Sequence, residues 1–461
     1  MSHYSQTGYR TKMKTFARFS PRPLLLAAAI TLATASTPGW AIDLSTAYQK
    51  ALNYDSELAA AAASRSAQAE NTNLSRSALM PIVAAGASTE HTDMKPEKFP
   101  DDSYLTSGVQ LSVTQPLLAM DSLYTYQASK DSEQKANEDF RSAQLDLLYR
   151  TANAYFTVLR GLDDLETAKK AEAAFRRQWE QAKERFEVGL IAITEVHETK
   201  AIYDSGKVTR INTQGQLDVA LEALQRITGE FVDQIHPLNE TISVEETEID
   251  QLANLEQIAL ENSPLIKGAV WQLEAARKNY KSKQAGYYPT LDLGASAGYS
   301  DYSGPYTQDD KQTDTKIGLT LNVPIYLGGS TQASTRQARY QVDQAEQGLL
   351  TAQRNVRLQL RTLYRTLQTN SEAIQARKQE TISNESALQA TRAGYDVGTR
   401  NIVEVLDAER KYYISLSAYA NARYDYILNR LTLRQATGTL QQGDLDRLNQ
   451  MLTAPIRING G

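Results

Sequence analysis

The sequence predicts an α+β fold made of two tandem repeats, in which very long helices alternate with pairs of amphipathic strands. Two stretches, residues 117–236 and 325–454, contain no proline and are rich in helix-forming residues. In the proline-bounded segment before each stretch, apolar residues recur at every second position, which is the period of a strand. The chain also matches itself at an offset of 208 to 209 residues, which indicates a duplication.

Residues 1–41 predict a secretory signal peptide with cleavage near Ala41. They contain five basic residues and no acidic residue, followed by the apolar run from Leu24 to Ala35 and then by small residues. The alternative is a membrane anchor, but these twelve apolar residues are fewer than the roughly 20 that a spanning helix needs. Met13 is an alternative start that would leave a signal of ordinary length.

Charge and cysteine content exclude several function classes. Removal of the five basic residues of the signal from the chain's 49 leaves 44 basic residues against 54 acidic ones, so the exported chain has no basic surplus for nucleic acid. The chain has no cysteine. Export without cysteine excludes disulfides, thiol catalysis and a lipid anchor attached to cysteine.

The duplication sets the expected domain boundaries. Pro81 matches Pro289 at an offset of 208, whereas Gly189 matches Gly398 at an offset of 209, so one inserted residue reconciles the two registers. Each repeat is expected to run helix, two strands, very long helix, tip and second helix. The expected domains are the signal peptide at 1–41, a first repeat at 42–230 with strands within 82–115 and a tip near 189, an inter-repeat segment at 231–250, a second repeat at 251–438 with strands within 290–323 and a tip near 398, and a C-terminal tail at 439–461.

Residues 118–187 and 330–396 predict the two very long helices, because they are rich in Ala, Gln, Arg, Leu and Glu. At about 1.5 Å per residue, each would reach roughly 100 Å. Apolar and small residues in the first of them step by three and four, which is the seam of a coiled coil and is interpreted as packing. These residues are Leu145, Leu148, Ala152, Tyr155 and Leu159.

The strand segments alternate over the length of roughly ten residues that a tilted membrane strand needs. Leu291, Leu293 and Ala295, for example, alternate with Asp292 and Gly294. Tyrosines gather at the strand ends, as aromatic residues do at membrane interfaces. The alternative interpretation is two soluble hairpins packed on a core.

Counting the strands predicts assembly. The chain supplies four such strands, whereas the smallest closed outer-membrane barrels have about eight, and open strand edges are not tolerated in lipid. We therefore expect the barrel to be shared between copies of the chain. The polar segments 90–103 and 300–316 are expected to be loops in water outside the cell, so the helices point into the periplasm.

Both tips resemble the TolC family of outer membrane factors. The resemblance rests on YDVGTRNIVEVLDAERKYY from Tyr395, on RFEVGLIAITEVHETKAIYD from Arg185 and on the closing ITGE and ATGT, and it covers nearly all of the mature chain. It implies a trimer with a twelve-stranded outer-membrane barrel, continued by a helical coiled-coil tunnel. It also implies a mixed equatorial domain formed by the inter-repeat segment and the C-terminal tail.

The resemblance also implies a gate at the periplasmic end that partners open. Two acidic residues, Glu404 and Asp407, would ring the constriction. The tips would contact a periplasmic adaptor through Val188, Gly189, Leu190, Val397, Gly398 and Thr399. The gating lock would consist of Tyr395 and Arg400 in the second repeat with Gln178, Thr194 and Glu195 in the first.

These assignments have a physical basis. Arg400 and Glu195 can form a charge-assisted pair that holds two helices together. Glu404 and Asp407 lie three residues apart on one helix face, and threefold symmetry would gather six carboxylates, favour cations and raise some carboxylate pKa values by repulsion. The alternative for Glu404, Asp407 and Glu409 is a solvated helix face. Glu195 and Glu404 stand where the family commonly has aspartate, which leaves the lock geometry open.

No catalytic constellation is visible in the sequence. The four histidines show no metal-ligand spacing, and no glycine loop for phosphate occurs. We therefore expect no enzyme activity, no cofactor and no metal, and an energy source in an inner-membrane ABC transporter or proton-driven pump joined through the adaptor. A trimeric coiled-coil adhesin with a shared barrel anchor and a small barrel enzyme are the competing hypotheses. The cargo and the pump are left open.

Overall fold

The computed structural model describes residues 41–95, 102–239, 251–303 and 310–458. Apart from Ala41, the expected signal peptide lies outside these residues, as does most of the expected inter-repeat segment. The helices and strands described below all belong to one compact unit, Gly39–Gly461. Within the described ranges, none of the helices is both long enough and apolar enough to cross a membrane.

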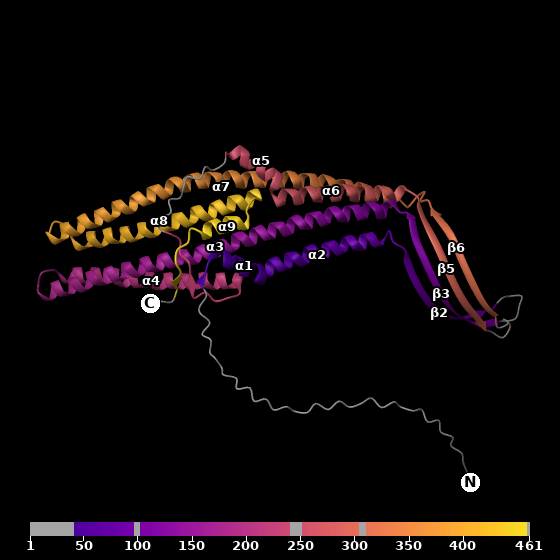
Figure 1. The fold of residues 1–461 in the computed structure, drawn as a ribbon, viewed down its shortest axis with the longest axis horizontal. Helices are drawn as coiled ribbons and strands as arrows, with labels where there is room; N and C mark the ends of the chain where they lie inside the picture. The colour runs from indigo at the N-terminus through magenta and orange to yellow at the C-terminus, as the bar shows by residue number, and fades with distance from the viewer. Residues whose placement is uncertain (1–40, 96–101, 240–250, 304–309, 459–461) are drawn as a thin grey trace, which may run out of the picture. The chain divides into compact units, whose positions relative to one another are not determined.

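The first half of the chain forms two short helices, a strand pair and a long helical hairpin (Figure 1). Asp43 and Asp55 begin the two short helices, because their carboxylates accept the backbone N–H groups of Thr46 and Leu58. Gly229 ends the hairpin with φ of 77°. The elements are β1 (Ala41–Ile42), α1 (Leu44–Tyr54), α2 (Ser56–Ser77), β2 (Ile82–Met94), β3 (Asp102–Leu118), α3 (Met120–Glu187), α4 (Ile193–Thr228) and β4 (Gln234–Ile235).

The second half repeats this order of elements. Pro264 begins its second helix, where a missing N–H costs nothing, and Gly438 ends the hairpin with φ of 72°. The elements are α5 (Leu252–Asn262), α6 (Pro264–Gln284), η1 (Ala285–Tyr287), β5 (Thr290–Ser303), β6 (Asp310–Asn322), α7 (Ser330–Asp396), α8 (Ile402–Thr437), α9 (Gln442–Asn449) and β7 (Ile456–Arg457).

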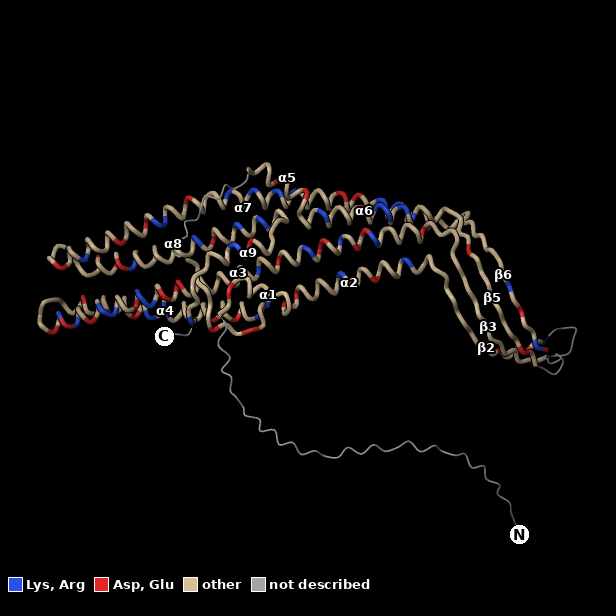
Figure 2. The backbone as a smooth tube through the Cα atoms, viewed as in Figure 1, with Lys and Arg blue, Asp and Glu red and all other residues tan. Residues whose placement is uncertain are grey.

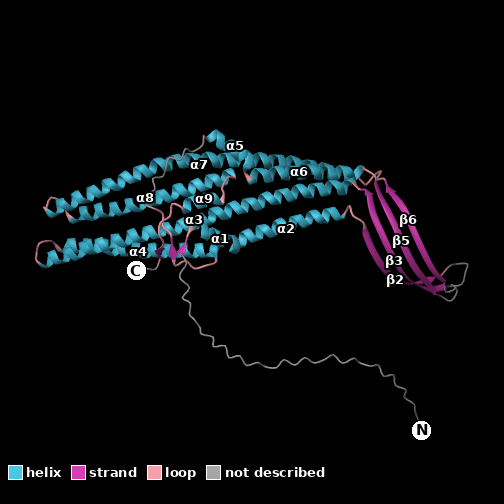
Figure 3. Cartoon of the chain, in the orientation of Figure 1, coloured by secondary structure: helices cyan, strands magenta, loops and turns pink. Residues whose placement is uncertain are grey.

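The four long strands form one antiparallel sheet in the order β2-β3-β5-β6 (Figure 3). Its register pairs Leu111 with Ala297 at the junction of the two repeats. Both β2 and β6 have one unpaired edge in the single chain. On β6, Ile317, Leu319 and Leu321 are 77%, 63% and 62% exposed, so an apolar row faces away from the protein.

The strands extend into the segments that the sequence analysis assigned to loops. Met94 pairs with Asp102, and Tyr302 pairs with Asp310, so the strands include residues 90–94 and 102–103 of the first segment and residues 300–303 and 310–316 of the second. The loop prediction was wrong at these boundaries because backbone pairing does not depend on side-chain polarity. Most charges on the strands lie towards their far ends, away from the helices (Figure 2).

The helices pack as two hairpins, α3 with α4 and α7 with α8, with α2 and α6 alongside the strand-proximal ends of α3 and α7 (Figure 1). The largest apolar cluster lies in the middle of the first hairpin, where Leu147, Phe156 and Leu217 are fully buried. The strands and the helix tips therefore lie at opposite ends of each hairpin.

A small three-stranded sheet closes the middle of the chain. Its order is β1-β4-β7, so the residues between the repeats lie between the first and the last described strands. Tyr155 of α3 donates its hydroxyl proton to the carbonyl of His236 at 2.8 Å. Asn449 of α9 donates to Asp43, and its side-chain oxygen accepts the N–H of Leu44, so the C-terminal tail is tied to the first helix.

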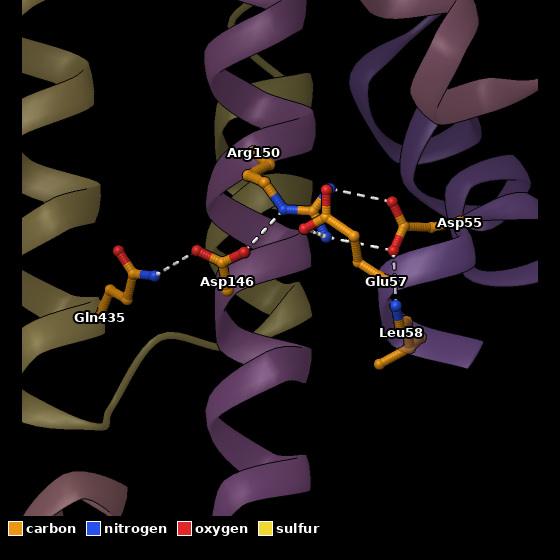
Figure 4. A network of polar contacts seen from close by, with 6 residues as sticks. All are labelled: Asp55, Glu57, Leu58, Asp146, Arg150 and Gln435. Atoms are coloured by element: carbon orange, nitrogen blue, oxygen red, sulfur yellow. Dashed lines mark hydrogen bonds and ion pairs between the residues drawn. The ribbon is translucent and has the colours of Figure 1, made fainter. Parts of the chain in front are cut away.

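An ion-pair network joins α2 and α3 (Figure 4). Arg150 donates to both carboxylate oxygens of Asp55 at 2.9 and 3.1 Å and to Asp146 at 2.6 Å. Burial raises the pKa of Asp55, but the hydrogen bonds from Arg150 and Leu58 outweigh it and hold that pKa below its ordinary value. Gln435 of α8 donates to Asp146, which connects the two hairpins through the same network.

Candidate gating site at the helix tips

The two tips are the same backbone motif repeated. In the first, the N–H of Leu190 reaches the carbonyl of Arg185 at 2.8 Å and the N–H of Gly189 reaches Phe186 at 2.9 Å. In the second, Thr399 reaches Gly394 at 2.9 Å in the corresponding bond. This is a Schellman motif, which needs a left-handed residue after the helix. Gly189 and Gly398, with φ of 79° and 76°, supply it.

The two tips differ in the chemistry they present. In the first, Val188 and Leu190 are 70% and 73% exposed, an unusual position for large apolar side chains. In the second, Val397 is 74% exposed, but Thr399 stands in place of the leucine. The six residues expected to contact an adaptor therefore lie on two exposed turns, one mainly apolar and one mixed.

Tyr395 lies against the first hairpin. The guanidinium carbon of Arg185, on α3, lies 5.0 Å from the centroid of the Tyr395 ring, and Arg185 also faces Asp396 at 3.9 Å. Gln178 lines the same cleft between α3 and α7. Tyr395 and Gln178 thus line one cleft together with Arg185, and the role of Tyr395 and Gln178 in a lock stays a prediction. The sequence signal for Arg185 was a cation one turn before Gly189.

Arg400, which precedes α8, pairs with Glu404 in the first turn of that helix. The guanidinium donates to the Glu404 carboxylate, and Asn401 caps the N–H of Glu404 at 2.9 Å. The Arg400 bond lowers the pKa of Glu404. Thr194 and Glu195 lie on the first turn of α4, and in the described part of this single chain no ion pair joins Glu195 to Arg400. The pairing of Arg400 with Glu195 stays a prediction.

Glu404 and Asp407 border one groove between α4 and α8, together with Glu198 of α4. Asp407 pairs with Lys411 at 2.8 Å and with Arg410 at 3.0 Å. Its hydrogen bond from Lys411, followed by that from Arg410, lowers its pKa. Within one chain both carboxylates therefore have lowered pKa values, because each has a cation beside it. Raised values from mutual repulsion stay a prediction for an assembled ring.

Glu409 departs most from the expectation of a solvated helix face. Its side chain is 0% exposed, and Arg392 of α7 donates to one of its oxygens. The other oxygen is buried and has no hydrogen-bond partner. Burial raises the pKa of Glu409, although Arg392 and Arg177 act in the opposite direction. For this residue the solvated interpretation was wrong, because the face of α8 that carries it turns towards α3.

Apolar contacts hold the two hairpins together near the tips. Val405 and Leu406 of α8 pack with Phe175 of α3, and all three are buried. Tyr413 meets Phe175 edge to face, with ring centroids 6.3 Å apart. Across the described residues, no group of three or more His, Cys, Asp or Glu side chains is placed to hold a metal ion.

Known proteins share both the sequence and the fold. The family model "Outer membrane efflux protein" matches residues 47–230 and 255–439. Outer membrane protein TolC of Vibrio cholerae serotype O1 is 36% identical over 433 residues, covering 93% of this chain and 97% of that protein. The alkaline protease secretion protein AprF of Pseudomonas aeruginosa is 27% identical over 421 residues, covering 88% of this chain and 86% of that protein.

The Campylobacter jejuni CmeC outer membrane channel has the same fold, with a TM-score of 0.77 at 17% identity. The match covers 89% of this chain and 90% of the CmeC chain. This likeness concerns the fold alone, whereas the family match spans both repeats. The chain belongs to the outer membrane efflux protein family.

Proposed function

We propose that three copies of this chain form an outer-membrane exit duct, with one twelve-stranded barrel and a helical tunnel in the periplasm. The observation that carries the proposal is the four-stranded sheet, which has two unpaired edges and an exposed apolar row on β6. A sheet in lipid must close on itself. Edge-to-edge pairing of β6 with β2 of the next copy would close it.

The family indicates the general function of such a duct. Its members are transport channels of the outer membrane rather than enzymes. One relative is named for secretion of an alkaline protease, and CmeC is described as an outer membrane channel. This chain is accordingly the outer-membrane part of an efflux or type I secretion system, in which an inner-membrane pump, joined through a periplasmic adaptor, supplies the energy. Nothing favours the adhesin hypothesis.

The proposed gate lies at the tips. In the closed duct the two hairpins of each copy pack together through Phe175, Val405 and Leu406. Arg400 holds Glu404 in the single chain, and in the closed trimer we assign Glu195 as its second partner. An adaptor that binds the exposed tip residues Val188 and Leu190 would gain apolar contact area there, and that binding would bias the hairpins towards separation.

Mass determination and planar-bilayer recording test the proposal together. Purified protein in detergent should have three times the mass of the mature chain and should produce small cation-selective currents. A variant that lacks β6 serves as the matched control, because it removes the strand edge needed to close the barrel but leaves the helices. A monomeric protein that is soluble without detergent and yields no current would overturn the proposal.

A further inference from the structure

A buried carboxylate with incomplete pairing lies at the seam between the two hairpins. Glu409 of α8 is fully buried, and Arg392 of α7 contacts only one of its oxygens. Arg392 itself is 44% exposed, so it keeps much of its water. Arg177 of α3 lines the adjoining cleft and acts on Glu409 electrostatically from the other hairpin.

The surroundings of Glu409 favour an uncharged side chain. Its neighbours along α8, Val405 and Leu406, are buried against α3, and Phe175 and Tyr413 close the same cluster. A carboxylate in such a place loses its hydration and regains only part of it through one arginine. Removal of one partner of an ion pair is strongly destabilising when the charge left behind is buried. Here that penalty applies to loss of Arg392, which leaves Glu409 buried, and not to loss of Glu409, which leaves the 44% exposed Arg392 in contact with water.

We propose that Glu409 is an opening element built into the gate: its half-paired carboxylate weakens the packed arrangement of α8 on α3 and regains water when the hairpins separate. The inference rests on the proposed function, in which the tips open by such a separation. In this arrangement the apolar cluster closes the gate and Glu409 opposes it. The gate therefore stays within reach of a partner that supplies limited binding free energy.

This proposal differs in sign from a second lock. A lock at Glu409 would make the channel leak when the carboxylate is neutralised. An opening element predicts the reverse for Glu409→Gln, which keeps the volume and removes the charge. Arg392→Gln should instead favour opening, because it leaves the carboxylate buried without its cation.

Single-channel recording of the full-length protein distinguishes these cases. Open probability should fall about tenfold in Glu409→Gln, since one buried and only half-paired charge is removed, and should rise about tenfold in Arg392→Gln. The matched controls are Glu380→Gln and Arg377→Gln on α7, which neutralise an exposed ion pair of the same two residue types. Both controls should stay within about twofold of the unmodified channel, as exposed pairs contribute little.

Acidification gives an independent measurement. The groups that face Glu409 are Arg392 from α7, Arg177 from α3 and Tyr413 from its own helix. Because the pKa of Glu409 is raised in the packed arrangement and returns towards its ordinary value on exposure, protonation favours the packed arrangement. Lowering the pH should close the channel, and this component should be missing in Glu409→Gln.

The outcomes separate the two proposals. Open probability in Glu409→Gln equal to or above that of the unmodified channel overturns the opening element, even if Arg392→Gln fails to fold. A preparation in which the unmodified protein and the exposed-pair controls form no channels contradicts the proposed function instead.

Discussion

Two glycines with the same backbone conformation should respond very differently to substitution by alanine. Gly398 at the second tip and Gly438 at the end of α8 have φ of 76° and 72°. A Cβ at Gly398 would meet nothing within 4 Å, whereas at Gly438 it would lie 2.4 Å from the carbonyl oxygen of Asn262 and 3.2 Å from Pro264.

The magnitudes follow from these distances. Both substitutions carry the left-handed cost of about 1 to 2 kcal/mol. Gly438→Ala must also displace the backbone between α5 and α6, and overpacking of this kind costs a further ~1 to 3 kcal/mol. We therefore expect Gly398→Ala to lower the free energy of unfolding by about 1 kcal/mol and Gly438→Ala by about 3 kcal/mol or more.

Urea unfolding in detergent, followed by circular dichroism, measures the difference. Gly443→Ala in α9 is a control, because its added Cβ meets nothing within 4 Å and alanine favours a helix, so its midpoint should stay or rise. Equal losses at Gly398 and Gly438 would refute the reasoning, since they would show that the Asn262 carbonyl moves aside at no cost.

Four further predictions concern the gate, the ion-pair network and the first tip. Arg400→Ser should enlarge single-channel currents by removing the proposed link to Glu195, and unchanged currents would remove Arg400 from the gate. Glu404→Ala combined with Asp407→Ala should reduce the cation preference measured by reversal potential, and an unaltered preference would exclude the ring. The pKa of Asp55 is lowered in the folded chain, so the stabilisation that Asp55 provides is present above the ordinary aspartate pKa and is lost as pH falls through the lowered value. Asp55→Asn should therefore reduce the unfolding midpoint at neutral pH and flatten the decline of that midpoint in acid. A decline parallel to that of the unmodified protein would contradict this. Leu190→Asp at the first tip should abolish export in cells while leaving bilayer currents intact, and normal export would rule out an apolar adaptor contact there.

Punctuation by proline and glycine made the long elements predictable from sequence. Residues 118–187 were expected to be helical and α3 occupies Met120–Glu187, while 330–396 coincides with α7 at Ser330–Asp396. Proline cannot continue a helix and glycine supplies the left-handed turn that ends one, so local residues fix these ends. The strand ends away from the helices carry no such constraint, and the loop boundaries there were accordingly misplaced.

The surroundings of the gate residues were not predictable in the same way. Glu409 and Asp407 lie two positions apart and each has a cation beside it, yet the side chain of Glu409 is fully buried and that of Asp407 is 39% exposed. Which face of α8 meets α3 depends on how two hairpins pack, and the residue pattern on one helix does not specify it. The contact of Arg185 with Tyr395 depends on the same packing.

The small sheet β1-β4-β7 has a consequence for biogenesis. Its central strand comes from mid-chain, and Ile235 pairs with Ile42 on one side and Ile456 on the other. A chain that enters the periplasm N-terminus first cannot complete this sheet until its last residues arrive, because those residues supply β7. Such pairing across the whole length delays folding. Until those residues arrive, β4 keeps one edge without its β7 partner, so the last residues of the chain complete this sheet.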